Sequence, residues 1–218
     1  MQSGPGLAHP IRVRYFLYLA IAGAALWAPS PSDAQTVQDS AAVSGPVTVE
    51  QKWRFFVQET FTPLTIVASA VTGGQSQAAN TDPRYGVGSI AMAKRFGAAT
   101  ADNVSQNFFS DFVMASVLHE DTKYRRKGEQ HGFWSRVGYA VSRAVVTRTN
   151  AGASTVNWAN LTGTALSVGL SNAYYPMRSR NLNATAINWG TSVAGAGFGN
   201  LAPEFLPDFK RWLKRHHL

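Results

Sequence analysis

Residues 89–105 read SIAMAKRFGAATADNVS, and a small side chain recurs in this stretch at every fourth position. The small residues are Ser89, Ala93, Gly97, Ala101 and Ser105. On an α-helix, residues four apart lie on one face, and a face without bulky side chains lets a second backbone approach closely. Glycine inside a helix costs about 1 kcal/mol relative to alanine, so a helical Gly97 needs such a packing role. The stretch therefore predicts a helix that packs through a face of small side chains.

The same four-residue spacing, here called a small-residue ladder, recurs later in the chain. The further members are Ala159, Gly163, Ser167 and Ser171, then Gly138 with Ser142, and Gly195 with Gly199. Apolar residues at helical spacing accompany these ladders, so the fold is predicted to be mainly α. We expect a compact bundle of about five or six helices packed through Gly/Ala/Ser faces. An outer-membrane β-barrel is the alternative, because uncharged segments with weak alternation also occur in barrels.

Residues 48–202 form the predicted helical domain. Thr48 and Gln51 stand three apart before an apolar run of helical period, which is typical of a capping box. The predicted helices are 49–71 with a kink at Pro63, 88–120, 133–147, 156–175 and 183–202, with loops at 75–83 and 121–132. Residues 166–171, LSVGLS, alternate in polarity, so a strand is the other interpretation of that segment.

The first 34 residues are organised like a secretory signal peptide. Arg12 and Arg14 precede an uncharged apolar stretch, and Ser32-Asp33-Ala34 supplies small residues at the cleavage positions. We therefore expect export to the periplasm or outer envelope of a bacterium, with residues 35–47 as a flexible leader. The chain contains no cysteine, which excludes a disulfide-rich extracellular module and a cysteine-ligated zinc site.

The formal net charge of +8 favours anionic partners, and the last segment, residues 203–218, is basic. On a helix its aromatic and cationic side chains would take opposite faces, as in a helix that lies in a lipid interface. The predicted membrane-contact residues are Phe205, Phe209, Lys210, Arg211, Trp212, Lys214 and Arg215. The expected partner is an anionic membrane surface or envelope polymer and no specific nucleic acid. A terminal helix docked on the domain by its aromatic face is the other interpretation.

The densest polar cluster is residues 119–127, HEDTKYRRK, between two apolar helices. It begins like a zinc-protease helix, but Lys123 stands where the second histidine is required, so neither a metal site nor a cofactor is predicted. The candidate residues are His119, Asp121, Arg125 and Arg126. A charged loop of internal ion pairs is one interpretation. In the other, the histidine and aspartate are the acid/base pair of a small hydrolase or transferase, and the arginines bind an anion.

Three blocks of the chain resemble an uncharacterised family of exported bacterial envelope proteins. The blocks are LHEDTKY at 118–124, SRVGYA at 135–140 and SNAYYP at 171–176, and the likeness spans roughly residues 48–209. The resemblance implies an envelope location, and because the family has no assigned activity it implies no catalytic residue. With the ladders and the tail, it predicts a non-enzymatic helical protein that is peripherally attached to a membrane. A free small-residue face would suit a protein partner that packs helix on helix.

Overall fold

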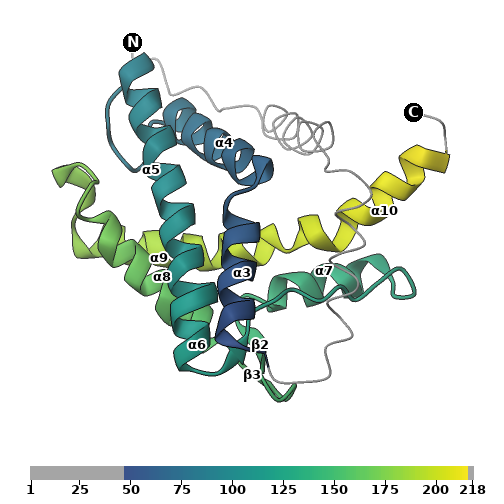
Figure 1. Cartoon of the computed structure of the whole chain (residues 1–218). Coiled ribbons are helices and arrows are strands. Elements are labelled where there is room, and N and C mark those ends of the chain that lie inside the picture. The colour runs from purple at the N-terminus through teal and green to yellow at the C-terminus, as the bar shows by residue number, and fades with distance from the viewer. Residues whose placement is uncertain (1–46, 216–218) are drawn as a thin grey trace, which may run out of the picture. The chain divides into compact units, whose positions relative to one another are not determined.

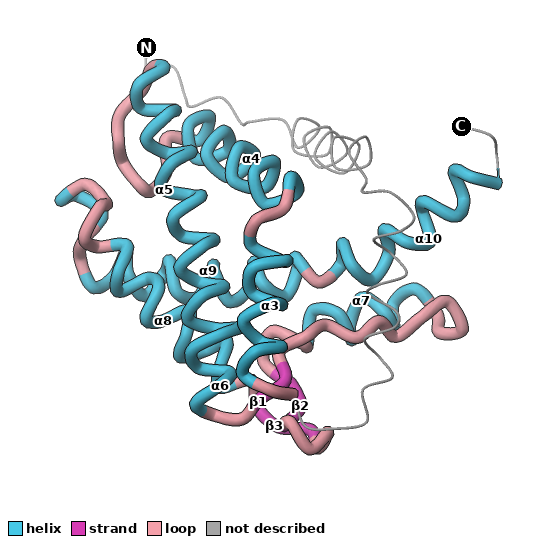
Figure 2. The backbone as a smooth tube through the Cα atoms, viewed as in Figure 1, coloured by secondary structure: helices cyan, strands magenta, loops and turns pink. Residues whose placement is uncertain are grey.

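The computed structural model describes residues 47–215. The predicted signal peptide, residues 1–34, lies outside this range, as do the predicted leader up to residue 46 and the last three residues of the tail. The described part is mainly α-helical with one small sheet, which confirms the predicted fold class (Figure 1, Figure 2).

The elements follow one another along the chain with short connections. The α-helices are α3 (Val49–Thr60), α4 (Pro63–Ala79), α5 (Ser89–Asn107), α6 (Ala115–Val117), α7 (Phe133–Ser142), α8 (Trp158–Ser171), α9 (Leu182–Gly199) and α10 (Leu201–Arg215). A π-helix, η2 (Phe108–Met114), joins α5 to α6, and a 3-10 turn, η3 (Met177–Ser179), precedes α9. The strands are β1 (Glu120–Asp121), β2 (Val146–Thr149) and β3 (Ser154–Val156).

The capping box predicted from the sequence fixes the start of α3. Gln51 N donates to Thr48 Oγ1 at 3.2 Å, and Thr48 N donates to Gln51 Oε1 at 2.9 Å. Further along the helix, the buried Phe56 packs edge-on against Phe108 of η2, with ring centroids 5.6 Å apart. Local sequence therefore sets where the helix begins, and its aromatic face sets what it packs on.

The small-residue ladder on α8 is buried, as predicted. Its members are Ala159, Gly163, Ser167 and Ser171. A Cβ added to Gly163 would lie 2.5 Å from the backbone N and Cα of Ser110 in η2, so the two backbones are in direct contact. On the same face, Ser167 Oγ lies 2.6 Å from Ser105 Oγ of α5. The absence of side-chain bulk on α8 is what lets η2 and α5 pack on it.

The prediction that the small residues of the α5 ladder form a packing face is wrong for the first half of the helix. Ser89, Ala93 and Gly97 are exposed, and a neighbouring stripe that includes Ala91 and Ala98 is buried in their place. Each residue turns the helix by about 100°, so a stripe displaced by one or two residues faces another direction. Small residues at both spacings are present in this sequence, and the packing of α4 on α5 selects between them.

The two-member ladders are also wrong. Gly138, Gly195 and Gly199 are exposed, and a Cβ added to any of them would meet no described atom within 4 Å. The close approach between α7 and α9 occurs at Gly197, where an added Cβ would lie 2.9 Å from Val141 O. Gly197 lies between the two glycines that the spacing had selected on α9.

Two predicted helix ends are corrected by contacts with other parts of the chain. Helix α4 continues past residue 74 to Ala79, because Gly73 lies against the backbone of α5, with an added Cβ 3.1 Å from Phe96 N. The predicted helix 133–147 ends at Ser142, and its last residues enter β2, which pairs antiparallel with β1 and β3. Residues 166–171 are helical, so the strand interpretation of that segment is wrong.

The interior of the described part is polar and much of its surface is apolar. The largest fully buried side chains are Arg95, Glu204, Thr147, Thr164, Ser69 and Ser179. Among the most exposed large apolar side chains are Leu182 at 85%, Trp134 at 80%, Met177 at 79% and Val87 at 78%. Globular proteins usually bury such residues and expose charged ones. Within residues 47–215, no helix has the length and apolar character that crossing a bilayer requires.

Candidate functional site

The structure does not assemble the predicted acid/base pair. His119 is exposed in a left-handed backbone conformation (φ 56°) just before β1. Asp121 is buried in β1, where its carboxylate accepts hydrogen bonds from Arg125 Nη2 at 2.8 Å and Lys123 N at 3.2 Å. Within the described chain no hydrogen bond joins His119 to Asp121. The carboxylate therefore holds its own loop in place, and nothing orients the imidazole for proton transfer.

The two arginines predicted to bind an anion are already paired within the chain. Arg125 contacts Asp121, as described above. Arg126 Nη2 lies 2.5 Å from Asp208 Oδ1, and Arg126 Nε donates to Glu204 O at 3.1 Å. Carboxylates and a carbonyl of the protein thus occupy the positions that an external anion would take. One ion pair internal to the loop, Arg125–Asp121, is present, and Arg126 pairs with α10 instead.

A fully buried carboxylate, Glu204 of α10, organises this loop. It accepts hydrogen bonds from Arg136 Nε at 2.6 Å, Tyr124 Oη at 2.8 Å, Lys127 N at 2.9 Å and Gly128 N at 3.2 Å. Burial by itself would raise the pKa of Glu204, but these donors outweigh burial, and the pKa lies below its ordinary value. The ionised group therefore ties α10 to α7 and to the 121–132 loop.

One turn later, Asp208 extends the same network. Its carboxylate contacts Arg136, Arg126 and Arg211, with N–O distances of 2.5, 2.5 and 2.7 Å respectively. Burial opposes ionisation here as well, but the three guanidinium groups hold the pKa of Asp208 well below its usual range. The signal in the sequence was present: Glu204 and Asp208 are the acidic residues of the basic tail, and they stand four apart.

The network divides the predicted membrane-contact residues into two groups. Phe205 lies under the guanidinium of Arg136, 4.3 Å from ring centroid to Cζ, and Arg211 pairs with Asp208 and Glu129. These two residues therefore serve to dock α10 on the domain. The other predicted residues lie toward the C-terminal end of the helix. They are Phe209 and Trp212, whose rings stack with centroids 6.0 Å apart, and Lys210, Lys214 and Arg215.

A half-buried carboxylate of α5, Asp102, holds the block SNAYYP in place. Asp102 accepts hydrogen bonds from the hydroxyls of Tyr174 and Tyr175, each at 2.6 Å. Burial raises the pKa of Asp102, and the two tyrosine hydrogen bonds only partly oppose that rise. Burial and the neighbouring carboxylate raise the pKa of both tyrosines, so neither phenol is poised to ionise. The arrangement is a structural clamp between α5 and the end of α8.

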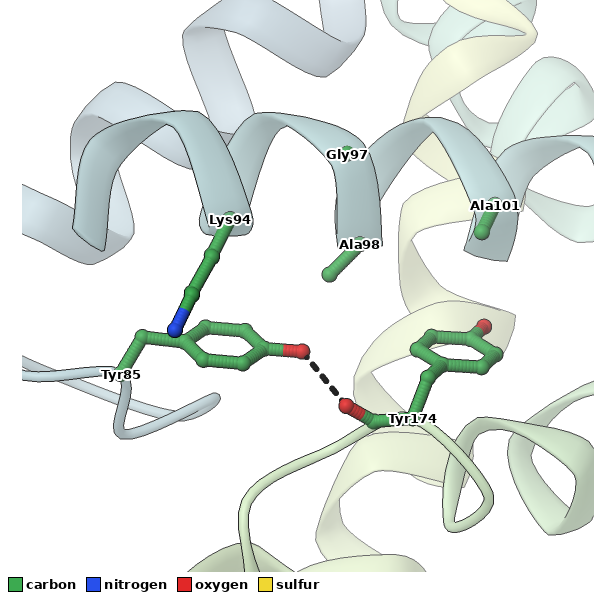
Figure 3. Close-up of a pocket in the computed structure, with 6 residues that line it drawn as sticks. All are labelled: Tyr85, Lys94, Gly97, Ala98, Ala101 and Tyr174. Carbon is green, nitrogen blue, oxygen red and sulfur yellow. Dashed lines mark hydrogen bonds between the residues drawn. The ribbon is translucent and has the colours of Figure 1, made fainter. Parts of the chain in front are cut away.

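Above this clamp lies a shallow groove of about 570 Å³. Its lining residues are Tyr85, Lys94, Gly97, Ala98, Ala101 and Tyr174. Figure 3 shows Lys94, Ala98 and Ala101 projecting from α5 toward the two tyrosine rings, and Tyr85 Oη donating to Tyr174 O at 2.8 Å. Two members of the α5 ladder, Gly97 and Ala101, thus lie in the wall of the groove together with Ala98 of the buried stripe. No ion pair joins Lys94 to a residue in the described range.

A second cavity, of about 390 Å³, contains two arginine side chains. It is lined by Asn80, Arg84, Gly86 and Arg178. Sequence reasoning did not select either arginine. A signal existed for one of them, because residues 149–177 contain no charged side chain and Arg178 is the first charge after that stretch.

The groove and the cavity offer hydrogen-bond donors and positive charge. They present guanidinium, ammonium, phenol and amide groups to a ligand. In the described region, no three His, Asp or Glu side chains come together as metal ligands would. Comparison of the chain with protein-family models, with curated proteins and with solved structures finds no match.

Proposed function

We propose that this chain is an exported, non-enzymatic helical protein that binds the anionic surface of an envelope membrane peripherally, in a structural or interaction role. The observation that carries the proposal is the polarity of the described part, which buries charged and hydroxyl side chains and exposes large apolar ones. Water does not favour that distribution, whereas a lipid interface accepts apolar side chains and leaves their polar neighbours at the headgroups.

The C-terminal part of α10 supports the same proposal. Phe209 and Trp212 are 41% and 48% exposed, and aromatic rings of this kind favour the membrane–water interface. Lys210, Lys214 and Arg215 form no ion pair with the part of the chain that the structure describes. Cations near an anionic membrane each contribute about 1 kcal/mol of attraction, so three of them supply a useful part of a binding energy.

The test is co-sedimentation of the exported chain with phosphatidylglycerol vesicles, with phosphatidylcholine vesicles as the uncharged comparison. We expect stronger binding to the anionic vesicles and a loss of binding as salt shortens the range of the attraction. Absence of binding to anionic vesicles would contradict the proposal.

The contribution of α10 is tested with the triple variant Lys210→Gln, Lys214→Gln, Arg215→Gln. Its affinity for the anionic vesicles should fall by up to about 100-fold. Arg54→Gln is the control, since that arginine is paired on the surface of α3 with Glu50 at 2.7 Å. Point variants are preferable to removal of residues 203–218, because truncation would also remove the buried Glu204 and its ion pairs.

A hydrolase or transferase built on His119 and Asp121 is the alternative function. Its residues are present, but no contact among the described residues favours it, because the carboxylate is engaged by Arg125 and the imidazole lies in solvent.

A further inference from the structure

One end of the described unit combines two arginine side chains that line a cavity with four of the five most exposed large apolar side chains of the described residues. It is formed by residues 82–90, which lead into α5, and residues 174–182, which lead into α9; we name these two segments together the arginine tip. Three hydrogen bonds join the segments: Ser179 Oγ to Asp82 Oδ1 at 2.6 Å, Arg84 N to Ser179 Oγ at 3.1 Å, and Tyr85 Oη to Tyr174 O at 2.8 Å. Because Ser179 is fully buried, the tip has a fixed shape.

The two arginines of the 390 Å³ cavity are available to a ligand. The guanidinium of Arg178 makes no hydrogen bond or ion pair with any described residue. Arg84 Nε forms an ion pair with Asp82 Oδ1 at 3.4 Å, and the side chain of Arg84 is 62% exposed, so its other guanidinium nitrogens can reach a ligand. Two guanidinium groups from separate segments therefore face one cavity, and of these Arg84 is paired with a carboxylate while Arg178 has no ion pair among the described residues.

A third positive charge lies beneath the cavity. Arg95 is 1% exposed, and its guanidinium donates to Gly86 O at 3.1 Å and to Pro83 O at 2.5 Å, with other carbonyl and side-chain oxygens completing its shell. All of its hydrogen-bond acceptors within the described chain are uncharged, so its charge is solvated by dipoles and is not cancelled. This buried guanidinium charge adds to the attraction for an anion.

Large apolar side chains occupy the outer surface of the same two segments. They are Leu182 at 85% exposed, Met177 at 79%, Val87 at 78% and Ile90 at 73%. A free anion in water would not need them. A phospholipid at a bilayer surface offers both a phosphate for the arginines and an apolar layer for these side chains.

We propose that the cavity between Arg84 and Arg178 binds the phosphate of a membrane phospholipid while the apolar side chains of the arginine tip enter the lipid interface. The planar guanidinium groups match two phosphate oxygens each, which favours phosphate over a compact halide ion. This inference rests on the proposed membrane function. It names the arginine tip as a membrane-contacting surface and the phosphate as the part of the lipid headgroup that is bound. The membrane contact at the arginine tip would be additional to the one at the end of α10.

The first test compares the binding of two charge-matched double variants to phosphatidylglycerol vesicles. Arg84→Gln/Arg178→Gln should weaken binding about 30-fold, the expected effect of two interfacial cations. Arg54→Gln/Arg148→Gln removes the same charge from α3 and β2 and should weaken it much less. If both double variants bind alike, or the tip variant binds like the unaltered chain, this inference is wrong while the proposed function stands. If the unaltered chain binds no vesicle, both are wrong.

The second test uses the absence of cysteine from the chain, which lets one introduced thiol carry an environment-sensitive fluorophore. A label at Val87→Cys should shift to the blue on anionic vesicles, and a label at Val156→Cys, on the β3 hairpin, should not. A label at position 87 that stays in water on bound vesicles overturns the inference. The inference is also overturned if inorganic phosphate, added without vesicles, shifts the fluorescence of the label in a saturable way. The site would then bind free phosphate and not a lipid.

Discussion

At the scale of single residues, the carboxyl groups of Glu204 and Asp111 differ in which protonation state their surroundings stabilise. Glu204 receives four hydrogen bonds at its carboxylate, one of them from the guanidinium of Arg136, and its pKa lies below the ordinary value. Asp111 of η2 is a half-buried residue near Glu59, and desolvation of its carboxyl raises the pKa to about 7, with a hydrogen bond from Thr122 only partly opposing that rise. The first group is stabilised as an anion and the second as a neutral acid.

Replacement of Glu204 by glutamine should destabilise the domain by about 3 kcal/mol, because it leaves Arg136 buried with one charged partner fewer. The unfolding free energy is measured by urea titration. Glu50→Gln removes a carboxylate of the exposed pair with Arg54 and should change stability by less than about 1 kcal/mol. Equal effects of the two substitutions would show that Glu204 does not hold α10 on the domain.

Asp111→Asn should change how stability depends on pH. A carboxyl whose pKa is about 7 in the folded state and near 4 when unfolded binds its proton more tightly in the folded state. Its contribution is therefore full below about pH 4 and is lost as the pH rises toward 7, by roughly 4 kcal/mol at most.

The neutral variant should lack that loss, so its stability relative to the unaltered chain should rise between pH 5 and about 7.5. Urea titrations of both proteins across this interval measure the difference. A difference that stays constant with pH would mean that Asp111 is ionised throughout.

The partners of Glu204 show why the sequence predicted only one of the two residues in each of its contacts. Glu204 was visible as an acid in a basic tail, but Arg136 and Tyr124, its partners, lie 68 and 80 positions away. No local pattern connects residues so far apart. The loop at 119–127 was recognised as a charged cluster because its charges are adjacent in the sequence. Its role was missed because several of its partners come from α10.

At the scale of elements, glycine decides how closely two helices approach. Gly163 and Gly169 lie on the same helix, α8, but only the first contacts another backbone. We expect Gly163→Ala to destabilise the protein by at least 1–3 kcal/mol, the usual range for overpacking, because its Cβ would lie 2.5 Å from the backbone of Ser110. Gly169→Ala, which meets no described atom within 4 Å, should stabilise the helix by about 0.5–1 kcal/mol.

Thermal and urea unfolding of the two variants measure these opposite effects. Because the same substitution is made twice in one helix, differences in intrinsic propensity cancel. If Gly163→Ala is tolerated as well as Gly169→Ala, η2 and α8 are not in backbone contact.

Local physics explains which elements the sequence could predict. Helix α3 follows from the capping box at Thr48 and from apolar spacing, both of which act within a few residues. Strand β2 was missed because residues 146–149 form a strand only through pairing with β1 and β3, one of which lies 26 positions away. The first half of the ladder on α5 was placed on the wrong stripe because the packing of α4 on α5 selects which stripe of small residues is buried there.

At the scale of the whole described unit, the polarity pattern is the property that no segment displays alone. Each helix carries both polar and apolar residues. The sequence shows that the faces of a helix differ in polarity, but not which face is buried. Packing determines that Arg95 and Thr164 go inside while Trp134 and Leu182 stay out. Hydrogen bonds and ion pairs compensate most of the buried polar groups, with Ser110 Oγ, Ser116 Oγ and Asn150 Oδ1 as exceptions, but the exposed apolar side chains gain nothing from water.

A lipid surface should therefore stabilise the folded chain. If anionic vesicles bind the folded state and not the unfolded one, the unfolding free energy rises by RT ln(1 + [L]/Kd), about 2.7 kcal/mol at a lipid concentration 100 times Kd. The urea midpoint, followed by tryptophan fluorescence, should rise with phosphatidylglycerol vesicles, rise less with phosphatidylcholine, and return toward its lipid-free value as salt is added. Salt without vesicles is the control. A urea midpoint that stays unchanged or falls when anionic vesicles are added would mean that the exposed apolar surface has another partner.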